Sequence, residues 1–275
     1  MHVIIFFPGL KNLFFYIDNL YDNKIKNVKM PDILIAGCGT GQQSITTVSR
    51  FSDCQVTAVD LSLASLAYAK RKTNELGITN LEYLQADILR LNNFEQKFDI
   101  IESAGVLHHM NEPMAGWRVL TDLLKPSGLM KIALYSELAR QHIVEVRKKI
   151  TLQRVGTSKS EIREFRRSLA ESNEESHQRL TKSNDFFNLS ALRDLIFHVQ
   201  EHRFTLPQIK NCLDELGLKF CGFENQDVIS ISNFRCKVAL SKKPKLFPLM
   251  NIYRVFHKEV CDSFFLIIGL KFGQF

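Results

Sequence analysis

Short apolar runs recur through the first half of the sequence and predict the strands of a sheet. They lie at 32–38, 55–60, 81–87, 98–103 and 128–135. Most are nearly continuous in apolar residues rather than alternating, as is typical of strands covered on both faces. Because stretches with helical character separate most of the runs, we expect parallel strands joined by helical crossovers. The predicted fold class is a doubly wound α/β sheet.

The pattern changes after Tyr135. From 136 to 204 we find no strand pattern, whereas Ser158 and Glu161 form a capping box before an apolar stripe with helical spacing. This predicts a helical insertion. The run LKFCGFE at 218–224 then returns to the sheet, and IIGLKFGQF at 267–275 is a candidate last strand.

Composition places the chain among globular proteins. It has 275 residues, of which 45% are hydrophobic and 24% charged, which excludes disorder and coiled coil and favours one elaborated domain. Six cysteines show no Cys-x-x-Cys pair, so we expect a reduced, cytoplasmic protein. The apolar runs at both ends are shorter than the ~20 residues of a membrane span, and we expect neither a signal peptide nor a span.

The net charge of +7 arises in the second half of the chain. Residues 1–135 carry 13 basic and 13 acidic side chains, whereas 136–275 carry 23 and 16. The segment 140–167 alone holds nine Lys or Arg against three acids. A charged helical segment is usually a solvated face, which is the favoured interpretation; an acidic partner or substrate is the alternative.

A glycine-rich turn follows the first predicted strand and precedes a helix. Glycine lets the backbone turn tightly and lets a ligand approach, and free amides at a helix start favour an anionic group. The turn reads Gly37-Cys38-Gly39-Thr40-Gly41.

Two carboxylates end the next two predicted strands. Asp60 lies 19 residues after Gly41, where a carboxylate accepts hydrogen bonds from ribose hydroxyls at the crevice of such a sheet. Asp87 could accept from an adenine amino group, with Leu61 and Ile88 against the ring. These strand ends predict a nucleoside site.

The spacing of the motifs discriminates between nucleotide ligands. The dinucleotide fingerprint Gly-x-Gly-x-x-Gly would place its last glycine at Gln42, which disfavours NAD. Five phrases over about 31–135 resemble, in order, the successive motifs of class I S-adenosylmethionine-dependent methyltransferases: DILIAGCGTGQ, VTAVDLS, LQADIL, FDIIESAGVLHHM and LLKPSGLM. More narrowly, the chain resembles bacterial methyltransferase domains often fused to tetratricopeptide repeats, although the sequence shows no repeat.

The resemblance implies a cofactor, S-adenosyl-L-methionine, and a mostly parallel, Rossmann-like sheet of seven strands. It places the glycine turn at the methionine end of the cofactor, Asp60 at the ribose, and Asp87, Leu61 and Ile88 at the adenine. Glu102 and Ser103 would lie beside the methionine moiety. The implied cofactor-binding residues are Gly37, Cys38, Gly39, Thr40, Gly41, Asp60, Leu61, Asp87, Ile88, Glu102 and Ser103.

A general base is optional, because the sulfonium already carries a good leaving group and the enzyme mainly aligns the acceptor. His108 is the best-placed candidate base, and a packing role for its ring is the alternative. Tyr135, Ser136 and Glu137 would face the acceptor side.

Four segments follow from this interpretation. They are an N-terminal extension (1–30), the cofactor-binding core (31–135), a helical insertion that acts as acceptor lid (136–204) and the C-terminal part of the sheet (205–275). The expected function is methyl transfer to an O, N or C acceptor, on a small molecule or a protein; the alternative is a non-catalytic binding or regulatory module. Nucleic acid is disfavoured, because no Asn/Asp-Pro-Pro-Tyr or Pro-Cys pair follows the fourth strand. The acceptor and the oligomeric state are not predicted.

A second motif suggests a different chemistry. His198, Glu201 and His202 spell the His-x-x-Glu-His pattern of inverted zinc peptidases. No third ligand follows in a motif that we recognise, so we expect no metal.

Overall fold

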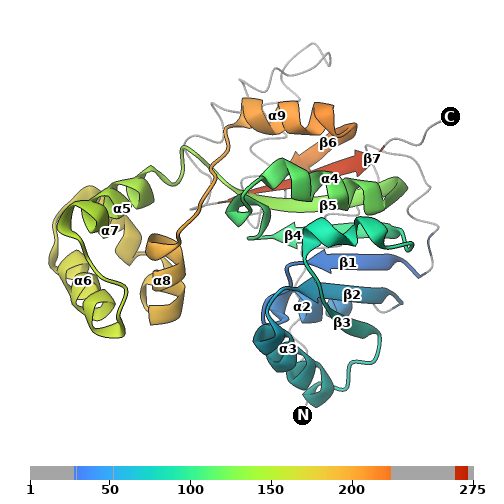
Figure 1. Ribbon diagram of the computed structural model, residues 1–275, viewed down its shortest axis with the longest axis horizontal. Coiled ribbons are helices and arrows are strands. Elements are labelled where there is room, and N and C mark those ends of the chain that lie inside the picture. Colours follow the sequence, from blue (N-terminus) through green and yellow to red (C-terminus); the bar gives the residue numbers. More distant parts are fainter. Residues whose placement is uncertain (1–27, 29, 52, 224–263, 272–275) are drawn as a thin grey trace, which may run out of the picture. The chain divides into compact units, whose positions relative to one another are not determined.

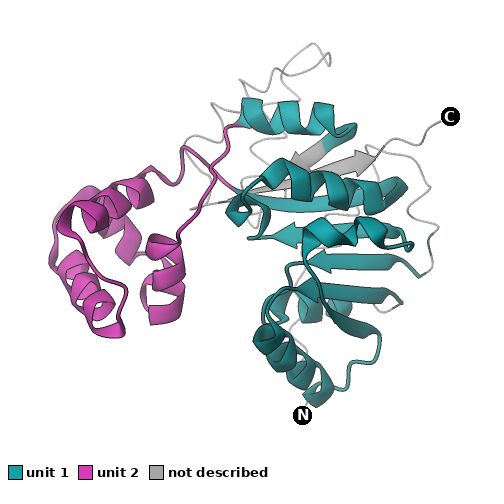
Figure 2. Cartoon of the chain, viewed as in Figure 1, with its two compact units in different colours: residues 1–134, 206–259, 265–275 teal, residues 135–205, 260–264 magenta. Residues whose placement is uncertain are grey.

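The computed structural model describes residues 28, 30–51, 53–223 and 264–271. Within the chain, two compact units separate: the sheet unit, with residues 1–134, 206–259 and 265–275, and the helical unit, with residues 135–205 and 260–264 (Figure 2). Most of the predicted N-terminal extension lies outside the described residues.

The sheet unit is built on strands in the order β3-β2-β1-β4-β5-β7-β6 (Figure 1). Five of them pair in parallel, and the order reverses between β1 and β4, which is the point where open α/β sheets bind ligands. The bounds are β1 Asp32–Ala36, β2 Gln55–Asp60, β3 Leu81–Gln85, β4 Phe98–Ala104, β5 Leu124–Tyr135, β6 Leu218–Phe223 and β7 Phe264–Lys271.

The prediction of a mostly parallel seven-stranded sheet holds for five strands. The remaining two, β6 and β7, pair with each other in antiparallel orientation. Residues 264–266 of β7 precede the predicted run 267–275, and residues 224–263 between β6 and β7 lie outside the described part of the chain.

Strand β5 begins four residues earlier than predicted. The Nζ of Lys125 lies 2.8 Å from Oδ2 of Asp32 and 2.8 Å from Oδ2 of Asp99, at the starts of β1 and β4. Leu124 also pairs with Phe98. This ion-pair bridge between three strands lies at the early start of β5, which the local sequence KPSG at 125–128 does not predict.

Helix α3 of the sheet unit has a capped start and a glycine at its end. Ser62 caps α3, since its Oγ accepts from the Ser65 amide at 3.2 Å, and Gly77 follows α3 with φ of +68°. Both α2 and α3 pack against β2 and β3, and α9 packs against β6. The bounds are α2 Gln42–Arg50, α3 Leu63–Glu75, α4 Pro113–Leu123 and α9 Leu206–Glu215, with 3₁₀ helices η2 Ile88–Asn93 and η3 Leu107–His109.

Burial confirms that the central strand is covered on both faces. Residues 33–36 of β1 are all buried, and β1 lies between β2 and β4. Ile33 and Ile35 share one core cluster with Val56 and Ala58 of β2. The apolar run at 32–38 therefore contains a central strand, whereas the run at 81–87 contains the edge strand β3, in which only Leu81 is buried.

The helical unit contains four α-helices and one 3₁₀ helix in residues 136–204. The predicted capping box is confirmed at Ser158 and Glu161, where side chain and backbone bond in both directions. Val146, Leu169 and Leu192 belong to a separate apolar core. The bounds are α5 Gln141–Gln153, α6 Lys159–Glu171, α7 Glu175–Thr181, η4 Asn184–Phe186 and α8 Leu189–Phe197. Across the described residues, no helix combines the length and apolarity that a membrane span needs.

Candidate functional site

The glycine turn after β1 adopts the left-handed backbone that its three glycines allow. Gly37, Gly39 and Gly41 have φ of +81°, +53° and +87°. A Cβ on Gly37 would lie 2.1 Å from Cγ2 of Val106. The same atom on Gly39 would meet nothing within 4 Å. The middle glycine thus leaves open space where a ligand can approach the backbone.

Gly41 is required by packing beneath the turn. A Cβ there would lie 2.7 Å from Cβ of Ala69 and 2.9 Å from the Tyr83 hydroxyl. That hydroxyl is fixed by Thr73, 2.8 Å away. The outer glycines hold the turn against the protein, and the middle one faces open space.

Asp60 joins the ends of β1 and β2. Its Oδ2 accepts from the Gly39 amide at 2.8 Å, and its Oδ1 accepts from the Ser62 amide at 2.9 Å. Each carboxylate oxygen has a second lone pair, so both can still accept a hydroxyl. Burial, with the Asp60 charge, raises the pKa of the Cys38 thiol to about 12, so Cys38 is a neutral part of the turn. Thr40 is exposed.

The end of β3 is attached to the end of β2. The Ala86 amide donates to the Asp60 carbonyl at 3.1 Å, and Nε2 of Gln85 donates to the Leu61 carbonyl at 3.1 Å. The next residue, Asp87, caps η2 by accepting from the Leu89 amide through Oδ1. Asp87 therefore has a structural role, and its Oδ2 is left for a second contact.

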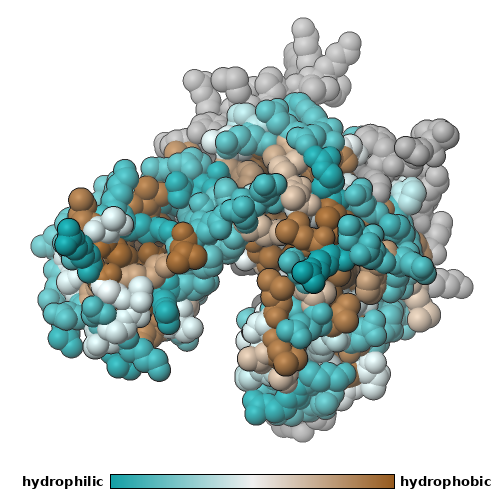
Figure 3. Space-filling view, in the orientation of Figure 1, coloured by the Kyte–Doolittle hydropathy of each residue, from teal (hydrophilic) through white to brown (hydrophobic). Residues whose placement is uncertain are grey.

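Apolar side chains flank these strand ends. Leu61 is 67% exposed, and Leu63, Leu84 and Leu89 are exposed as well, whereas Ile88 is buried. Figure 3 shows apolar surface on the visible face of the sheet unit. Exposed leucines beside Asp60 and Asp87 fit a site that covers a flat aromatic ring.

Glu102 of β4 turns toward helix α2. Its Oε2 accepts from Nε2 of Gln43 at 2.8 Å and from Oγ1 of Thr47 at 3.1 Å, and the residue is buried. Gln43 and Thr47 were not predicted, although their i, i+4 spacing on one helix face was visible in the sequence. Glu102 therefore fixes the helix that starts at the glycine turn. Beside it, the Ser103 hydroxyl is fully buried and finds no hydrogen-bond partner among the described residues.

His108 lies in η3 and has no exposed surface. Its ring centroid is 4.3 Å from that of His109. Gly116 of α4 permits close packing nearby, since a Cβ would lie 2.4 Å from Sδ of Met110. A ring in this position reaches an acceptor only if it becomes uncovered, and the general-base role of His108 stays a prediction.

The residues expected on the acceptor side belong to the helical unit. Tyr135 is buried, and burial raises the pKa of its hydroxyl to about 12, so the hydroxyl stays protonated. The Phe204 amide donates to the Tyr135 carbonyl at 2.8 Å, and the Glu137 amide donates to the Phe204 carbonyl at 3.0 Å. The first and last segments of the insertion are therefore hydrogen-bonded neighbours.

The His-x-x-Glu-His phrase does not form a metal site. Helix α8 ends at Phe197, so His198 and His202 do not share a helix face. Nδ1 of His198 lies 2.7 Å from the Gln200 carbonyl oxygen, and Glu201 is occupied by arginines. In the described part of the chain no group of three or more metal-ligating side chains gathers.

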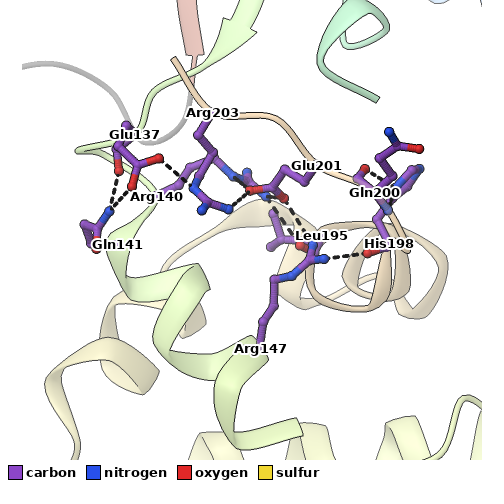
Figure 4. A network of polar contacts seen from close by, with 9 residues as sticks. All are labelled: Glu137, Arg140, Gln141, Arg147, Leu195, His198, Gln200, Glu201 and Arg203. Atoms are coloured by element: carbon purple, nitrogen blue, oxygen red, sulfur yellow. Dashed lines mark hydrogen bonds and ion pairs between the residues drawn. The ribbon is translucent and has the colours of Figure 1, made fainter. Parts of the chain in front are cut away.

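The arginines around Glu201 form a partly buried charged group, which we call the arginine cluster: Glu137, Arg140, Arg147, Glu201 and Arg203 (Figure 4). The Arg140 side chain is 1% exposed, and its guanidinium lies 3.5 Å from the centroid of the Tyr135 ring. The interpretation of 140–167 as a solvated face is therefore wrong for Arg140, whereas Arg163 and Arg167 are exposed as expected.

Parts of the chain are similar to known proteins. Residues 33–128 match a family profile described as a methyltransferase domain. An uncharacterized protein of Synechococcus sp. is 28% identical over 209 residues, which cover 72% of this chain and 49% of that protein. Malonyl-[acyl-carrier protein] O-methyltransferase of Acetivibrio thermocellus is 28% identical over 107 residues, 39% of this chain and 36% of that enzyme.

A solved structure gives the same fold. PKMT2 from Rickettsia typhi, in complex with AdoHcy, superposes with a TM-score of 0.66 at 15% identity, covering 88% of this chain and 50% of that one. The chain spans about half the length of this protein and of the Synechococcus relative. Together these findings show that the chain shares the fold of PKMT2 and contains a segment that matches a methyltransferase-domain profile.

Proposed function

We propose that the chain transfers a methyl group from S-adenosylmethionine to an O, N or C acceptor on a small molecule or a protein. One observation carries the proposal: the 2.8 Å hydrogen bond from the Gly39 amide to Asp60, beside the open space over Gly39. It brings together a turn that a ligand can approach and a carboxylate that can accept ribose hydroxyls, at the reversal point of the sheet.

The residues at these strand ends fit the cofactor. Gly39 offers backbone surface to the methionine end, and the buried Ser103 hydroxyl is a polar atom without a protein partner among the described residues. Leu61 lies next to Asp60 in the chain and is exposed, so its side chain is available to cover an adenine ring. Asp87 keeps one carboxylate oxygen for the adenine amino group.

When bound, S-adenosylmethionine supplies a methyl group on a sulfonium, which needs no further activation. The protein then has to hold the acceptor in line and exclude water. In this proposal Asp60 binds the ribose, while Glu102 orients α2 through Gln43 and Thr47. His108 serves as the base only for an acceptor that arrives protonated.

The helical unit is proposed to select the acceptor. It follows β5 directly, so the chain enters it from the carboxyl end of a central strand, the edge at which parallel sheets bind their ligands. The Synechococcus alignment covers 72% of the chain, so it must extend into this unit. The finer relation to methyltransferases fused to tetratricopeptide repeats is part of this proposal.

The alternative is a module that binds without catalysis. Relatives whose names specify O-methyl and N-methyl transfer, from Acetivibrio thermocellus and Papaver somniferum, favour the enzyme. In the glycine turn, Gly37 and Gly41 are closely packed against the protein, whereas Gly39 faces open space. A module that bound no nucleoside would not need this open space.

The test is calorimetric titration of the full chain with S-adenosylmethionine and S-adenosylhomocysteine, followed by a methyl-transfer screen over proteins, quinones and small acids. Asp60→Asn keeps an oxygen for the Gly39 amide but loses the charge and the acceptor of the Ser62 amide, and we expect cofactor binding to weaken by about 1.5 to 3 kcal/mol. Asp122→Asn, at an exposed position of α4, is the matched control and should bind normally. Unchanged affinity in folded Asp60→Asn would overturn the ribose assignment.

A further inference from the structure

We infer that the arginine cluster binds a carboxylate group of the methyl acceptor. The inference rests on the proposed function and names the chemical class of the acceptor. It starts from the charges of the cluster: three guanidinium groups face two carboxylates. One positive charge is left over within a partly buried group, which an anion would compensate.

The excess charge is shared around Glu201. Its Oε1 accepts from Nε of Arg140 at 3.1 Å and from Nη1 of Arg203 at 3.3 Å. Its Oε2 accepts from Nη2 of Arg140 at 2.8 Å and from Nη1 of Arg147 at 3.2 Å. A single carboxylate thus holds three arginines. Glu137 compensates Arg203 alone, through Nε at 3.0 Å.

Among the described residues Arg147 has no carboxylate of its own. Besides the shared Glu201, its guanidinium bonds there only to the His198 carbonyl, through Nη2 at 2.6 Å. Its side chain is 24% exposed and that of Arg203 is 26% exposed, so both can meet a ligand. Behind them Arg140 is 1% exposed, and its Nη1 is buried without a hydrogen-bond partner among the described residues.

This arrangement differs from a structural ion-pair network. Burying charge is unfavourable unless it is paired and its hydrogen-bonding groups are satisfied. Within the described part of the chain, a buried guanidinium here keeps a donor without an acceptor, and three arginines face two carboxylates. Two further acids lie within electrostatic reach of the neighbouring Tyr135, namely Asp185 and Asp194, but both are exposed and neither is ion-paired to the cluster.

The ligand that matches is a monoanion with two coplanar oxygens. One negative charge balances the excess, whereas a phosphate with nearly two would reverse it. Guanidinium groups bind carboxylates through paired N–H donors, a geometry that lysine does not reproduce. A carboxylate on the acceptor would hold it at the start of the insertion, where Glu137 follows β5.

The test uses acetate as the probe and the full chain as the protein. Arginine Nε–Hε resonances are followed by NMR during titration with acetate at constant ionic strength, with acetamide, chloride and phosphate as parallel titrants. We expect saturable shifts for Arg147 and Arg203 with acetate only. Saturation by phosphate or chloride to the same extent, or none with acetate, would overturn the inference.

Two variants separate geometry from charge. Arg147→Lys keeps the charge but loses the planar donors, and should weaken acetate binding about tenfold or more, the loss expected for charged hydrogen bonds. Arg163→Lys, at an exposed position of α6, is the matched control and should bind acetate normally. Should Arg147→Lys fail to fold, Arg203→Lys provides the same comparison. Normal acetate binding by the folded variant would overturn the inference.

A methyl-transfer screen then connects the site to the acceptor. Compounds are tested in pairs that differ only by carboxylate against carboxamide, and the acids should react at least about tenfold faster. Equal rates for both members, together with normal S-adenosylhomocysteine binding, would overturn this inference and leave the proposed function standing. Failure to bind S-adenosylhomocysteine, while acetate still saturates, would instead overturn the proposed function.

Discussion

The sheet unit and the helical unit place their polar groups by different physical means. In the sheet unit, strand ends bring backbone amides to Asp60, and glycines provide the space. In the helical unit, long side chains from distant segments meet around the buried Glu201. The site at Asp60 depends on the positions of glycines in the turn, whereas the arginine cluster depends on the pairing of charged side chains.

This difference decides how each site can be recognised and how it fails. The Gly39–Asp60 contact spans 21 residues and repeats a spacing that the topology of parallel strands imposes. The Arg140–Glu201 contact spans 61 residues, with no periodic signal between them. Substitution of the open Gly39 should therefore act mainly on ligand access, whereas removal of the shared carboxylate Glu201 should act mainly on stability.

The largest expected effect is that of Glu201→Ala. Removal of this carboxylate leaves three arginines without their shared partner, and a broken buried ion pair costs about 3–5 kcal/mol. Urea unfolding combined with hydrogen exchange should show the loss of protection in α5 and α8, with the sheet unit retained. Glu171→Ala, an exposed residue at the end of α6, is the control. A loss below about 1 kcal/mol would show that the cluster is loosely held and weaken the comparison.

Two glycine variants should separate packing from access within one turn. In Gly41→Ala the new Cβ would clash with Ala69 and Tyr83. We therefore expect overpacking to lower the free energy of unfolding by about 1–3 kcal/mol, in addition to the cost of the positive φ. Gly39→Ala meets no neighbour and should carry only the backbone cost, about 1–2 kcal/mol. The affinity of Gly39→Ala for S-adenosylhomocysteine should nevertheless fall, because the added Cβ occupies the open space over the turn. The bulkier Gly39→Val should abolish this binding.

Unfolding curves and S-adenosylhomocysteine titrations of both glycine variants provide the measurement. If Gly39→Ala binds the cofactor as well as the wild type does, the open side of the turn is not the ligand side.

Acid should destabilise the helical unit through Glu201. Burial alone would raise the pKa of this carboxyl, but the hydrogen bonds and charges of Arg140, with Arg147 and Arg203, lower it overall. A pKa that is lower in the folded state gives stability that is present above the ordinary glutamate value and is lost as the pH falls through the folded value. The free energy of unfolding should therefore fall more steeply below about pH 4 in the wild type than in Glu201→Gln. Parallel curves would contradict this assignment.

The smallest expected effect is that of reversing exposed charges on α6. Arg163→Glu with Arg167→Glu should change stability by no more than about 1 kcal/mol, because isolated surface charges contribute little. Methyl-transfer rates at sub-saturating acceptor should keep the same salt dependence as in the wild type. A rate that falls in the double variant, with a flatter salt slope, would restore the acidic-partner alternative for this face.

The sequence predicts the features that local spacing encodes. The glycine turn, Asp60 at the end of β2 and the capping box at Ser158 all depend on residues close together in the chain. The start of β5 was missed because it depends on Lys125 meeting two acids from other strands.

Charge patterning misled in one place for a related reason. Arg140 and Arg163 occur in the same basic segment, and composition cannot tell which of them will be covered. Arg140 is buried because Tyr135 and Glu201, five residues before it and 61 after it, surround its guanidinium. Glu102 is similar: its position at a strand end suggested a ligand contact, whereas two side chains of α2 take up one of its oxygens.

The hydrogen bonds between Phe204 and the segment 135–137 have an evolutionary consequence. They hold the entry and exit of the inserted segment side by side, so a short loop could close the gap if the segment were deleted, and a different segment could be grafted there. Insertions of this kind can be exchanged between lineages without rebuilding the sheet that receives them. Recombination at these two positions would therefore be a route by which one sheet unit acquires a different inserted segment.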